Sequence, residues 1–147
     1  MNNQQAQLAR QIYDGWIGVN NAFHAKLQPR MAQSPISFSQ YEVLFAIHNL
    51  GIDTVSVKDL SQFMLKTSSA ITQAVASLEK QKLVKRVHAT EDRRVVHVKP
   101  TQKGTSAFKQ MDDVIVSSLG EAISSLTPDE ISEYIRINTK IAKLSEK

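Results

Sequence analysis

Cysteine is absent from the 147-residue sequence. Its absence excludes disulfide bridges, thiolate zinc sites and redox sensing by cysteine. No apolar run reaches the roughly 20 residues that a membrane-spanning helix needs, and the opening residues, MNNQQAQLARQ, do not form a signal peptide. The default expectation is therefore a cytoplasmic protein that makes no membrane contact.

Catalytic motifs are missing as well. The sequence has no glycine-rich phosphate loop, nucleophile elbow or HExxH motif. Asp112 and Asp113 are neighbours on a predicted helix, so their side chains diverge and cannot form an acid–base pair. His88 and His97 could meet across a hairpin and bind a metal with Asp92, but two histidines in a solvated ribbon more often only add polarity. We expect no enzyme, cofactor or metal site.

Charge is present but unevenly spread. The chain carries a net charge of +4, yet the window from Lys80 to Lys109 holds nine basic residues against two acidic ones, Glu91 and Asp92. That window has a net charge of +7, which leaves −3 for the rest of the chain. A local basic block points to an anionic partner, most commonly nucleic acid. On charge alone, a plain solvated surface is about as good an explanation.

Apolar spacing and capping signals predict the elements of the first half. A helix is expected over Gln4–Leu27, followed by a linker that Pro29 and Pro35 bracket. Ser39 and Glu42 are expected to form the capping box of the next helix.

Residues 56–81 are predicted to form two helices joined by a polar turn. Ser56 and Asp59 mark the start of a short helix over about 57–63, which buries Leu60 and either Phe63 or Met64. A longer helix over about 68–81 has an apolar face of Ile71, Val75 and Leu78. Its other face carries small and polar side chains: Ser68, Ser69, Thr72, Gln73, Ala76 and Lys80.

A basic hairpin follows, in which the runs LVKRVH and VVHVKP flank the polar turn ATEDRR. Lys85 and Arg86 lie along the first strand, and Arg93 and Arg94 lie at the tip, where arginine suits a narrow minor groove. Asp92 is expected to accept backbone N–H bonds in the turn and to pair with an arginine, which would aim Arg94.

Two long helices are predicted for the remainder. Thr101 can cap the first, which runs to about Ser125, and Thr127 with Glu130 can cap the second. The terminal helices have more apolar surface than one stripe, so they need something to bury it. A second copy of the chain is the simplest source, and packing within one chain is the alternative.

The short helix, the polar turn, the helix with a small polar face and the basic hairpin together make a winged helix-turn-helix arrangement. Gln73 could pair with an adenine edge, Ser and Thr hydroxyls with bases or phosphates, and Ala76 with a thymine methyl. A plain amphipathic surface helix would be the more ordinary interpretation of residues 68–81 alone; the basic hairpin shifts the balance toward DNA.

The segment VKDLSQFMLKTSSAITQAVASLEKQKLVKRVHATEDRRVVHVKPTQKG resembles the DNA-binding core of the MarR family of bacterial transcription regulators. The resemblance lies in the LS of the short helix, in SSAITQAVASLEKQKLVKR, in EDRR and in T-x-K-G, and the outer helices extend it over nearly the whole chain. Two residues depart from the family pattern: Lys82 replaces the usual Gly, and Pro100 stands where L-T is usual.

The resemblance implies a fold that is mainly α with a small β-hairpin wing. It implies a DNA-binding lobe over residues 37–104 and dimerisation helices over 1–36 and 105–147. It also implies a homodimer on double-stranded DNA at a pseudo-palindromic operator, usually as a repressor, with Asp92 and Arg94 as the D-x-R pair of the wing.

Many members of the family also bind a small molecule between the dimer helices and the DNA-binding lobe. Trp16, Phe23, Tyr41 and His48 are the candidates for such an effector site, although core or dimer packing is the more ordinary role of Trp16 and Phe23. The alternative function is a winged-helix module that binds proteins and no DNA.

Overall fold

The computed structural model describes residues 2–51, 54–88 and 96–143. The chain forms two compact units. We call Gln28–Ile115 the central lobe, and Met1–Leu27 together with Val116–Lys147 the terminal unit. None of the described helices is both long enough and apolar enough to cross a membrane.

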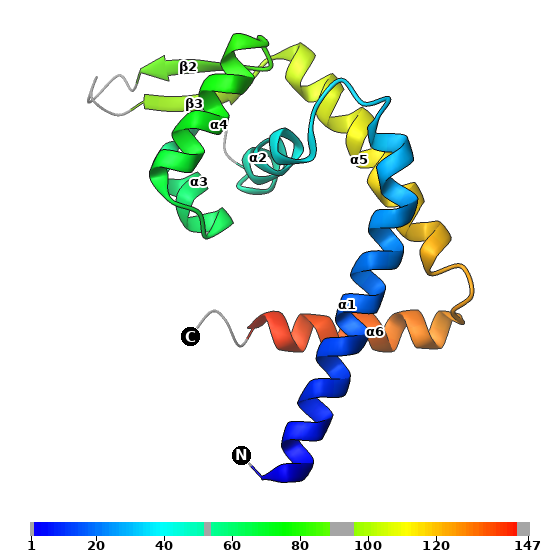
Figure 1. The fold of residues 1–147 in the computed structure, drawn as a ribbon. Helices are drawn as coiled ribbons and strands as arrows, with labels where there is room; N and C mark the ends of the chain where they lie inside the picture. The colour runs from blue at the N-terminus through cyan, green and yellow to red at the C-terminus, as the bar shows by residue number, and fades with distance from the viewer. Residues whose placement is uncertain (1, 52–53, 89–95, 144–147) are drawn as a thin grey trace. The chain divides into compact units, whose positions relative to one another are not determined.

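The elements follow in the predicted order of helices and hairpin (Figure 1). They are α1 (Asn3–Met31), α2 (Phe38–Asn49), β1 (Val55–Ser56), α3 (Val57–Met64), α4 (Ser68–Lys80), β2 (Val84–His88), β3 (Val96–Pro100), α5 (Gln102–Ala122) and α6 (Pro128–Ala142). The fold class predicted from the sequence, mainly α with a small β wing, is confirmed.

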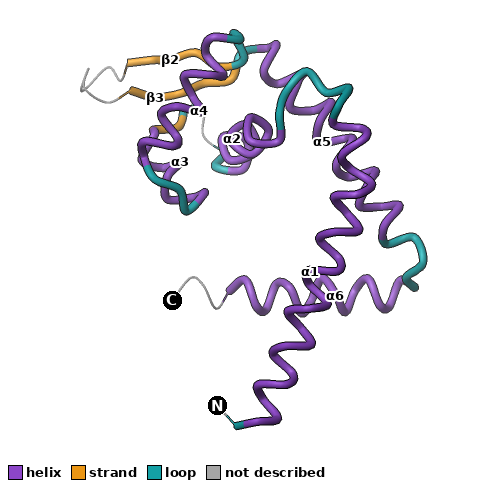
Figure 2. Tube along the Cα trace, viewed as in Figure 1, coloured by secondary structure: helices purple, strands orange, loops and turns teal. Residues whose placement is uncertain are grey.

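The sheet contains a strand that the sequence did not predict. β1 pairs antiparallel with β3, and β3 pairs antiparallel with β2, which gives the strand order β1-β3-β2 (Figure 2). β1 is only two residues long, too short for an alternating pattern to show. Val55 and its partner Val98 are both fully buried, so this pairing fixes the base of the hairpin to the core.

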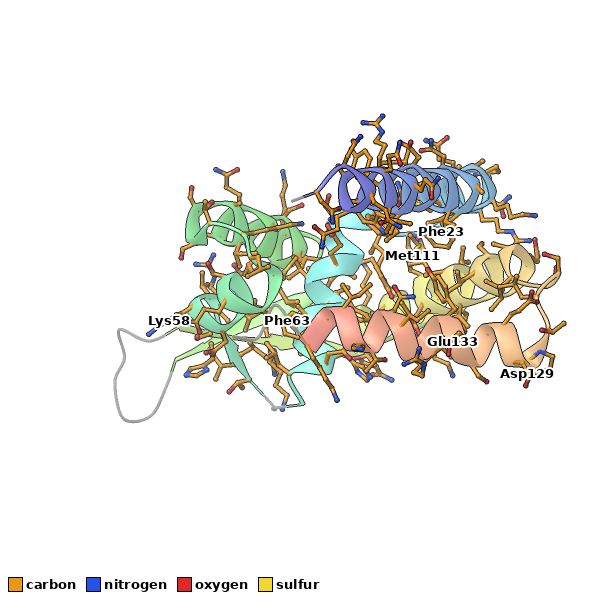
Figure 3. All side chains as sticks on the ribbon, turned by 90° about the horizontal axis from the view of Figure 1, so that it is seen from below. Phe23, Lys58, Phe63, Met111, Asp129 and Glu133 are labelled. Atoms are coloured by element: carbon orange, nitrogen blue, oxygen red, sulfur yellow. The ribbon has the colours of Figure 1, made fainter. Side chains whose placement is uncertain are left out.

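The core of the central lobe forms where α2, α3 and α4 meet the sheet. The predicted stripe of α4 is confirmed, since Ile71, Val75 and Leu78 are at most 1% exposed. On α3, Leu60 is fully buried, whereas Phe63, labelled in Figure 3, is 45% exposed. Of the two candidates for the second α3 contact, Met64 is the one packed against the core.

Two sequence predictions near α2 are wrong, and the first concerns its cap. The capping box is formed by Ser37 and Gln40, not by Ser39 and Glu42: the Ser37 N–H donates to Gln40 Oε1 (2.9 Å), and the Gln40 N–H donates to Ser37 Oγ (3.3 Å). Both serines have the required spacing, and the earlier one leaves Glu42 free to pair with Lys66 at 2.8 Å.

The predicted linker begins later than expected, because Pro29 lies inside α1. A proline removes one intrahelical hydrogen bond and crowds the preceding turn. Pro29 is two residues from the end of the helix, so the missing hydrogen bond and the crowding fall near the C-terminal end of α1. α5, in turn, ends at Ala122 rather than near Ser125.

The remaining predicted caps are confirmed. Ser56 and Asp59 form a capping box, and hydrogen bonds from the Ser56 hydroxyl and N–H hold the pKa of the Asp59 carboxyl below its usual value. Thr127 and Glu130 form the second box, with Pro128 in the first turn of α6.

Lys82 adopts the left-handed conformation that its helix end requires, with φ of 60°. Its N–H donates to the Glu79 carbonyl (2.9 Å), and the Leu83 N–H donates to the Leu78 carbonyl (2.9 Å). This is the Schellman pattern, in which glycine is the usual residue because it has no Cβ penalty. α4 therefore ends in the ordinary way at a cost of about 1 kcal/mol.

The first turn of α5 is docked on the chain that leaves α4. Thr101 donates from its N–H to the Leu83 carbonyl (3.0 Å) and from its hydroxyl to the Lys82 carbonyl (2.7 Å). Lys103 Nζ donates to the Gln81 carbonyl (3.0 Å). A Cβ at Gly104 would overlap the Leu83 carbonyl oxygen. The T-x-K-G motif is thus explained by this docking. Thr101 and Lys103 donate the hydrogen bonds, and Gly104 allows the close approach.

We expect Gly104→Ala to lower the free energy of unfolding by about 1–3 kcal/mol, because the added methyl meets backbone that cannot move aside alone. Gly120→Ala is the matched control in the same helix. Nothing lies near its Cβ position, so it should raise stability by up to about 1 kcal/mol. Urea denaturation at one protein concentration measures both, and equal effects of the two substitutions would contradict the docking.

Candidate nucleic-acid interface

The basic block of the sequence lies in the central lobe. Lys80 belongs to α4, Lys85 and Arg86 to β2, Lys99 to β3, and Lys103 to α5. The tip of the hairpin, with Asp92, Arg93 and Arg94, lies outside the described residues. Lys82 follows α4 in a turn and Lys109 lies further along α5, so the described cations of the block are carried by α4 and the turn after it, by the strands of the wing and by α5.

The outer face of α4 matches the predicted one. Ser68, Ser69, Thr72, Gln73 and Ala76 are all exposed, on the side away from the buried stripe. The helix begins at a Thr67 cap, whose hydroxyl accepts from the Ala70 N–H (3.3 Å). A face of this kind can approach a groove closely because nothing bulky projects from it.

The hydroxyls on this face do not all have the same freedom. Thr72 Oγ1 donates to the Ser68 carbonyl (2.7 Å), so its proton is already used and it offers a lone pair and a methyl group. Among the described residues, nothing is hydrogen-bonded to the side chains of Ser69 and Gln73. These two are therefore the best placed to donate and accept at an incoming ligand.

The turn before α4 is held by its own contacts. Leu65 ends α3 in the left-handed conformation (φ of 51°) and is 92% exposed. Ser61 Oγ donates to the Lys66 carbonyl (2.6 Å), and Lys66 Nζ pairs with Glu42 of α2. These bonds hold the turn that leads into α4 and connect it to α3 and α2. No sequence signal pointed to Leu65, since leucine rarely adopts this conformation.

The cations of the wing strands are arranged in two ways. Lys85 and Lys99 are direct cross-strand partners, so two like charges lie on one face of the hairpin. Arg86, by contrast, has its Nε 3.1 Å from the Glu79 carboxylate of α4. The predicted DNA-binding role of Arg86 therefore starts from an internal ion pair that the sequence did not reveal.

The histidine pair of the hairpin yields no metal site among the described residues. No group of three His, Asp or Glu side chains comes together there. Asp92 and the side chain of His88 lie outside the description. His97 lies between β1 and β2, opposite Ser56 and Val87, and its Nδ1 is buried without a hydrogen-bond partner in the described structure.

Two of the four predicted effector-site residues come together around Phe108 of α5. Tyr41 stacks on Phe108 with ring centroids 5.5 Å apart, and His48 lies 5.1 Å from the same ring. Tyr41 also donates its hydroxyl to Asp112 (2.7 Å). Burial, reinforced by this bond to a carboxylate, raises the pKa of Tyr41 far above its usual value.

A cavity of about 230 Å³ opens beside Phe108 and His48. Leu44 and Ile47 provide apolar walls, and Lys99 provides a cation. His48 was predicted from the sequence, whereas Phe108 and Lys99, which lie far from it in the chain, were not. Trp16 and Phe23 belong to the terminal unit and do not line this cavity; Trp16 is 64% exposed.

The terminal unit has much exposed apolar surface. On α1, Ile12, Trp16 and Val19 are each more than half exposed. On α6, which can be followed from Asp129 in Figure 3, no described residue is buried. Ile131 is half-buried, and four further apolar residues are 43–59% exposed: Tyr134, Ile135, Ile137 and Ile141. A scattered exposed leucine is ordinary, but continuous apolar helix faces mark an interaction surface.

Comparison with known proteins relates this lobe to one family. Residues 34–95 match the model of the MarR family. The HTH-type transcriptional repressor MdtR of Bacillus subtilis is 28% identical over an alignment of 129 residues, which covers 85% of this chain and 82% of that protein.

Solved structures show the same fold at lower identity. A mutant MarR from Escherichia coli, complexed with operator DNA, has a TM-score of 0.70 and 22% identity, covering 95% of this chain and 96% of that one. BpsR of Bordetella bronchiseptica, described for regulation of its DNA binding by 6-hydroxynicotinic acid, has a TM-score of 0.74 and 20% identity, covering 90% of this chain and 98% of that one.

Proposed function

Because this chain is a MarR-family transcriptional regulator, we propose that it represses transcription as a homodimer bound to a pseudo-palindromic operator. The observation that carries the proposal is the exposed face of α4, which bears only small and polar side chains. It adjoins a wing that lies within residues 80–109, a segment with a net charge of +7. α4 enters the major groove, and Arg94 reaches the minor groove. The protein acts in the cytoplasm, on the chromosome.

Each residue of α4 has a role that its surroundings allow. Gln73 pairs with a base edge, adenine being the best partner for an amide. Ser68 and Ser69, in the first turn, contact a phosphate near the N-terminus of the helix. Thr72 and Ala76 offer methyl groups to a thymine, since the Thr72 proton is used within the helix.

The wing supplies charge rather than sequence reading, apart from Arg94. Lys85 is directed at phosphates, whereas its cross-strand neighbour Lys99 lines the cavity beside Phe108. Arg86 and Arg93 also contact the backbone, Arg86 by exchanging Glu79 for a phosphate. That pair is about 40% exposed on both sides, and such pairs are worth little, so the exchange costs little. Asp92 orients the tip.

The alternative, a winged-helix module that binds proteins and no DNA, has less support. Such a module has no use for a concentration of cations around a bare helix face. The family consists of transcriptional regulators rather than enzymes. DNA binding and protein binding differ in how strongly added salt weakens affinity. Only contacts to phosphates release condensed counterions, so DNA affinity falls steeply as salt rises.

We expect selection from random duplexes to yield inverted half-sites about 10 base pairs apart, centre to centre. Gln73→Ala should weaken operator binding by about 1–3 kcal/mol and relax the base preference at one position of each half-site. Arg94→Ala should weaken operator binding by a similar amount and relax the preference for the flanking A·T pairs. Lys85→Ala should weaken all duplexes alike and lower the salt slope by about one. Lys140→Ala, on α6, is the control. Failure to enrich any sequence would refute DNA reading.

We propose that dimerisation buries the exposed apolar side chains of the terminal unit. We expect the chain to sediment at twice its 16.4 kDa mass, and Trp16→Asp to produce monomers, because a carboxylate would enter an apolar interface. Asn21→Asp, exposed on the far side of the same helix, adds the same charge as a control. Light scattering measures both, and a dimeric Trp16→Asp variant would contradict this role of α1.

A small anionic effector is proposed for the cavity beside Phe108. Its volume suits a ligand smaller than a typical drug, and Lys99 with two aromatic neighbours favours a planar carboxylate. We expect benzoate or 6-hydroxynicotinate to bind by calorimetry and to weaken duplex affinity, with Lys99→Met abolishing the heat. Because such coupling is reciprocal, duplex should weaken ligand binding by the same factor. Equal ligand affinity with and without duplex would exclude an effector role.

A further inference from the structure

The rotation of α4 about its own axis is not fixed by its buried stripe alone. Ile71, Val75 and Leu78 determine how deeply the helix sits, but apolar burial is non-directional. Apolar contacts restrain the rotation less sharply than a hydrogen bond does, because only the hydrogen bond is directional. The exposed side chains, on the opposite side of the helix, move with any such rotation.

Two polar contacts hold the flanks of α4. Successive residues of a helix are about 100° apart, so Ser77 and Glu79 project to either side of the buried Leu78. On one flank, Gln40 Nε2 of α2 donates to Ser77 Oγ (3.3 Å). On the other, Glu79 pairs with Arg86 of β2.

The Gln40 contact is the one held from a buried side chain, although Ser77 itself is exposed. Gln40 is 9% exposed, whereas both side chains of the ion pair are about 40% exposed and hydrated. Its amide is also oriented in advance, because Oε1 accepts the Ser37 N–H that starts α2 (2.9 Å). With the oxygen committed there, the amide nitrogen is left to face α4.

The next residue of α2 holds a different helix. Tyr41 is bonded to Asp112 of α5 and stacked on Phe108. Gln40 and Tyr41 are consecutive, so their side chains leave α2 about 100° apart and reach α4 and α5 respectively. The orientation of α4 is thereby linked, through one turn of α2, to α5, the helix that leads out of the central lobe.

A rotation of about 10° moves a side-chain end roughly 5–6 Å from the helix axis by about 1 Å. Hydrogen bonds to base edges tolerate less than that, since their donor–acceptor distances span only about 2.7–3.2 Å. Phosphate contacts made by long, flexible lysines tolerate it easily. Loss of rotational control would therefore weaken the reading of sequence before it weakened general attraction to DNA.

From this geometry we infer that Gln40 is a positioning residue for sequence recognition: its amide, braced by the α2 cap and bonded to Ser77, sets the rotation at which α4 presents Gln73 to a base edge. The inference rests on the proposed function, since it concerns how that function is made selective. Gln40, on α2 and 9% exposed, acts through Ser77 and does not itself touch DNA in this arrangement.

The test uses the full-length protein and two duplexes: one selected from the random pool, and one with the same bases scrambled. Ser77→Ala removes the bridge and leaves the cap of α2 intact. It should reduce the preference for the selected duplex about fivefold or more, with unchanged affinity and salt slope on the scrambled one. Ser77→Thr keeps a hydroxyl and should keep the preference. Ser106→Ala, exposed on α5, is the matched control.

Gln40→Met removes both the bridge and the cap, so it should also lower stability. Combined with Ser77→Ala it should reduce the preference no further than the larger single effect, because both substitutions break one contact. Glu79→Gln should instead raise affinity for both duplexes, by releasing Arg86, and leave their ratio unchanged.

An unchanged ratio for Ser77→Ala would overturn the inference, as would equal losses on both duplexes or additive effects in the double variant. A wild-type protein that selects no duplex would refute the proposed function instead, so the two failures are distinguishable.

Discussion

Three consecutive carbonyl groups, those of Gln81, Lys82 and Leu83, hold the central lobe together at the end of α4. Thr101 and Lys103 donate to all three, and Gly104 lets the first turn of α5 approach closely enough for them to do so. The Gln81 carbonyl, at the C-cap of α4, has no partner within the helix. The candidate recognition helix, the wing and α5 therefore meet at one junction and share its geometry.

How much of this could be read from the sequence depended on whether the signal was local. Capping boxes at Ser56 and Thr127 involve residues three apart, and both were predicted correctly. Ser37 and Ser39 offered the same local signal, and only tertiary contacts of Gln40 and Glu42 decide between them. The two-residue strand β1 has too little sequence to show a pattern at all.

The candidate site divides in the same way. The exposed face of α4 follows from helical periodicity, so its members were identified from sequence spacing. The contacts that hold α4 on its flanks could not be identified in this way. Ser77 is 37 residues from its partner Gln40, and Arg86 meets Glu79 only because the hairpin folds onto α4. Periodicity thus indicated which side chains face outward, whereas only the structure shows what controls their direction. The roles of Asp92, Arg93 and Arg94 stay predictions.

Leu65 and Lys82 lie just before and just after α4, and each has a left-handed backbone that suits glycine far better. Each carries a strain of about 1 kcal/mol. Stability is thus forgone at the two ends of a helix whose middle is well packed. A glycine at either position would relieve this strain and raise the free energy of unfolding, without changing Ser69 or Gln73. A substitution of a DNA-facing residue that lowers stability could therefore be compensated in evolution by a glycine at position 65 or 82.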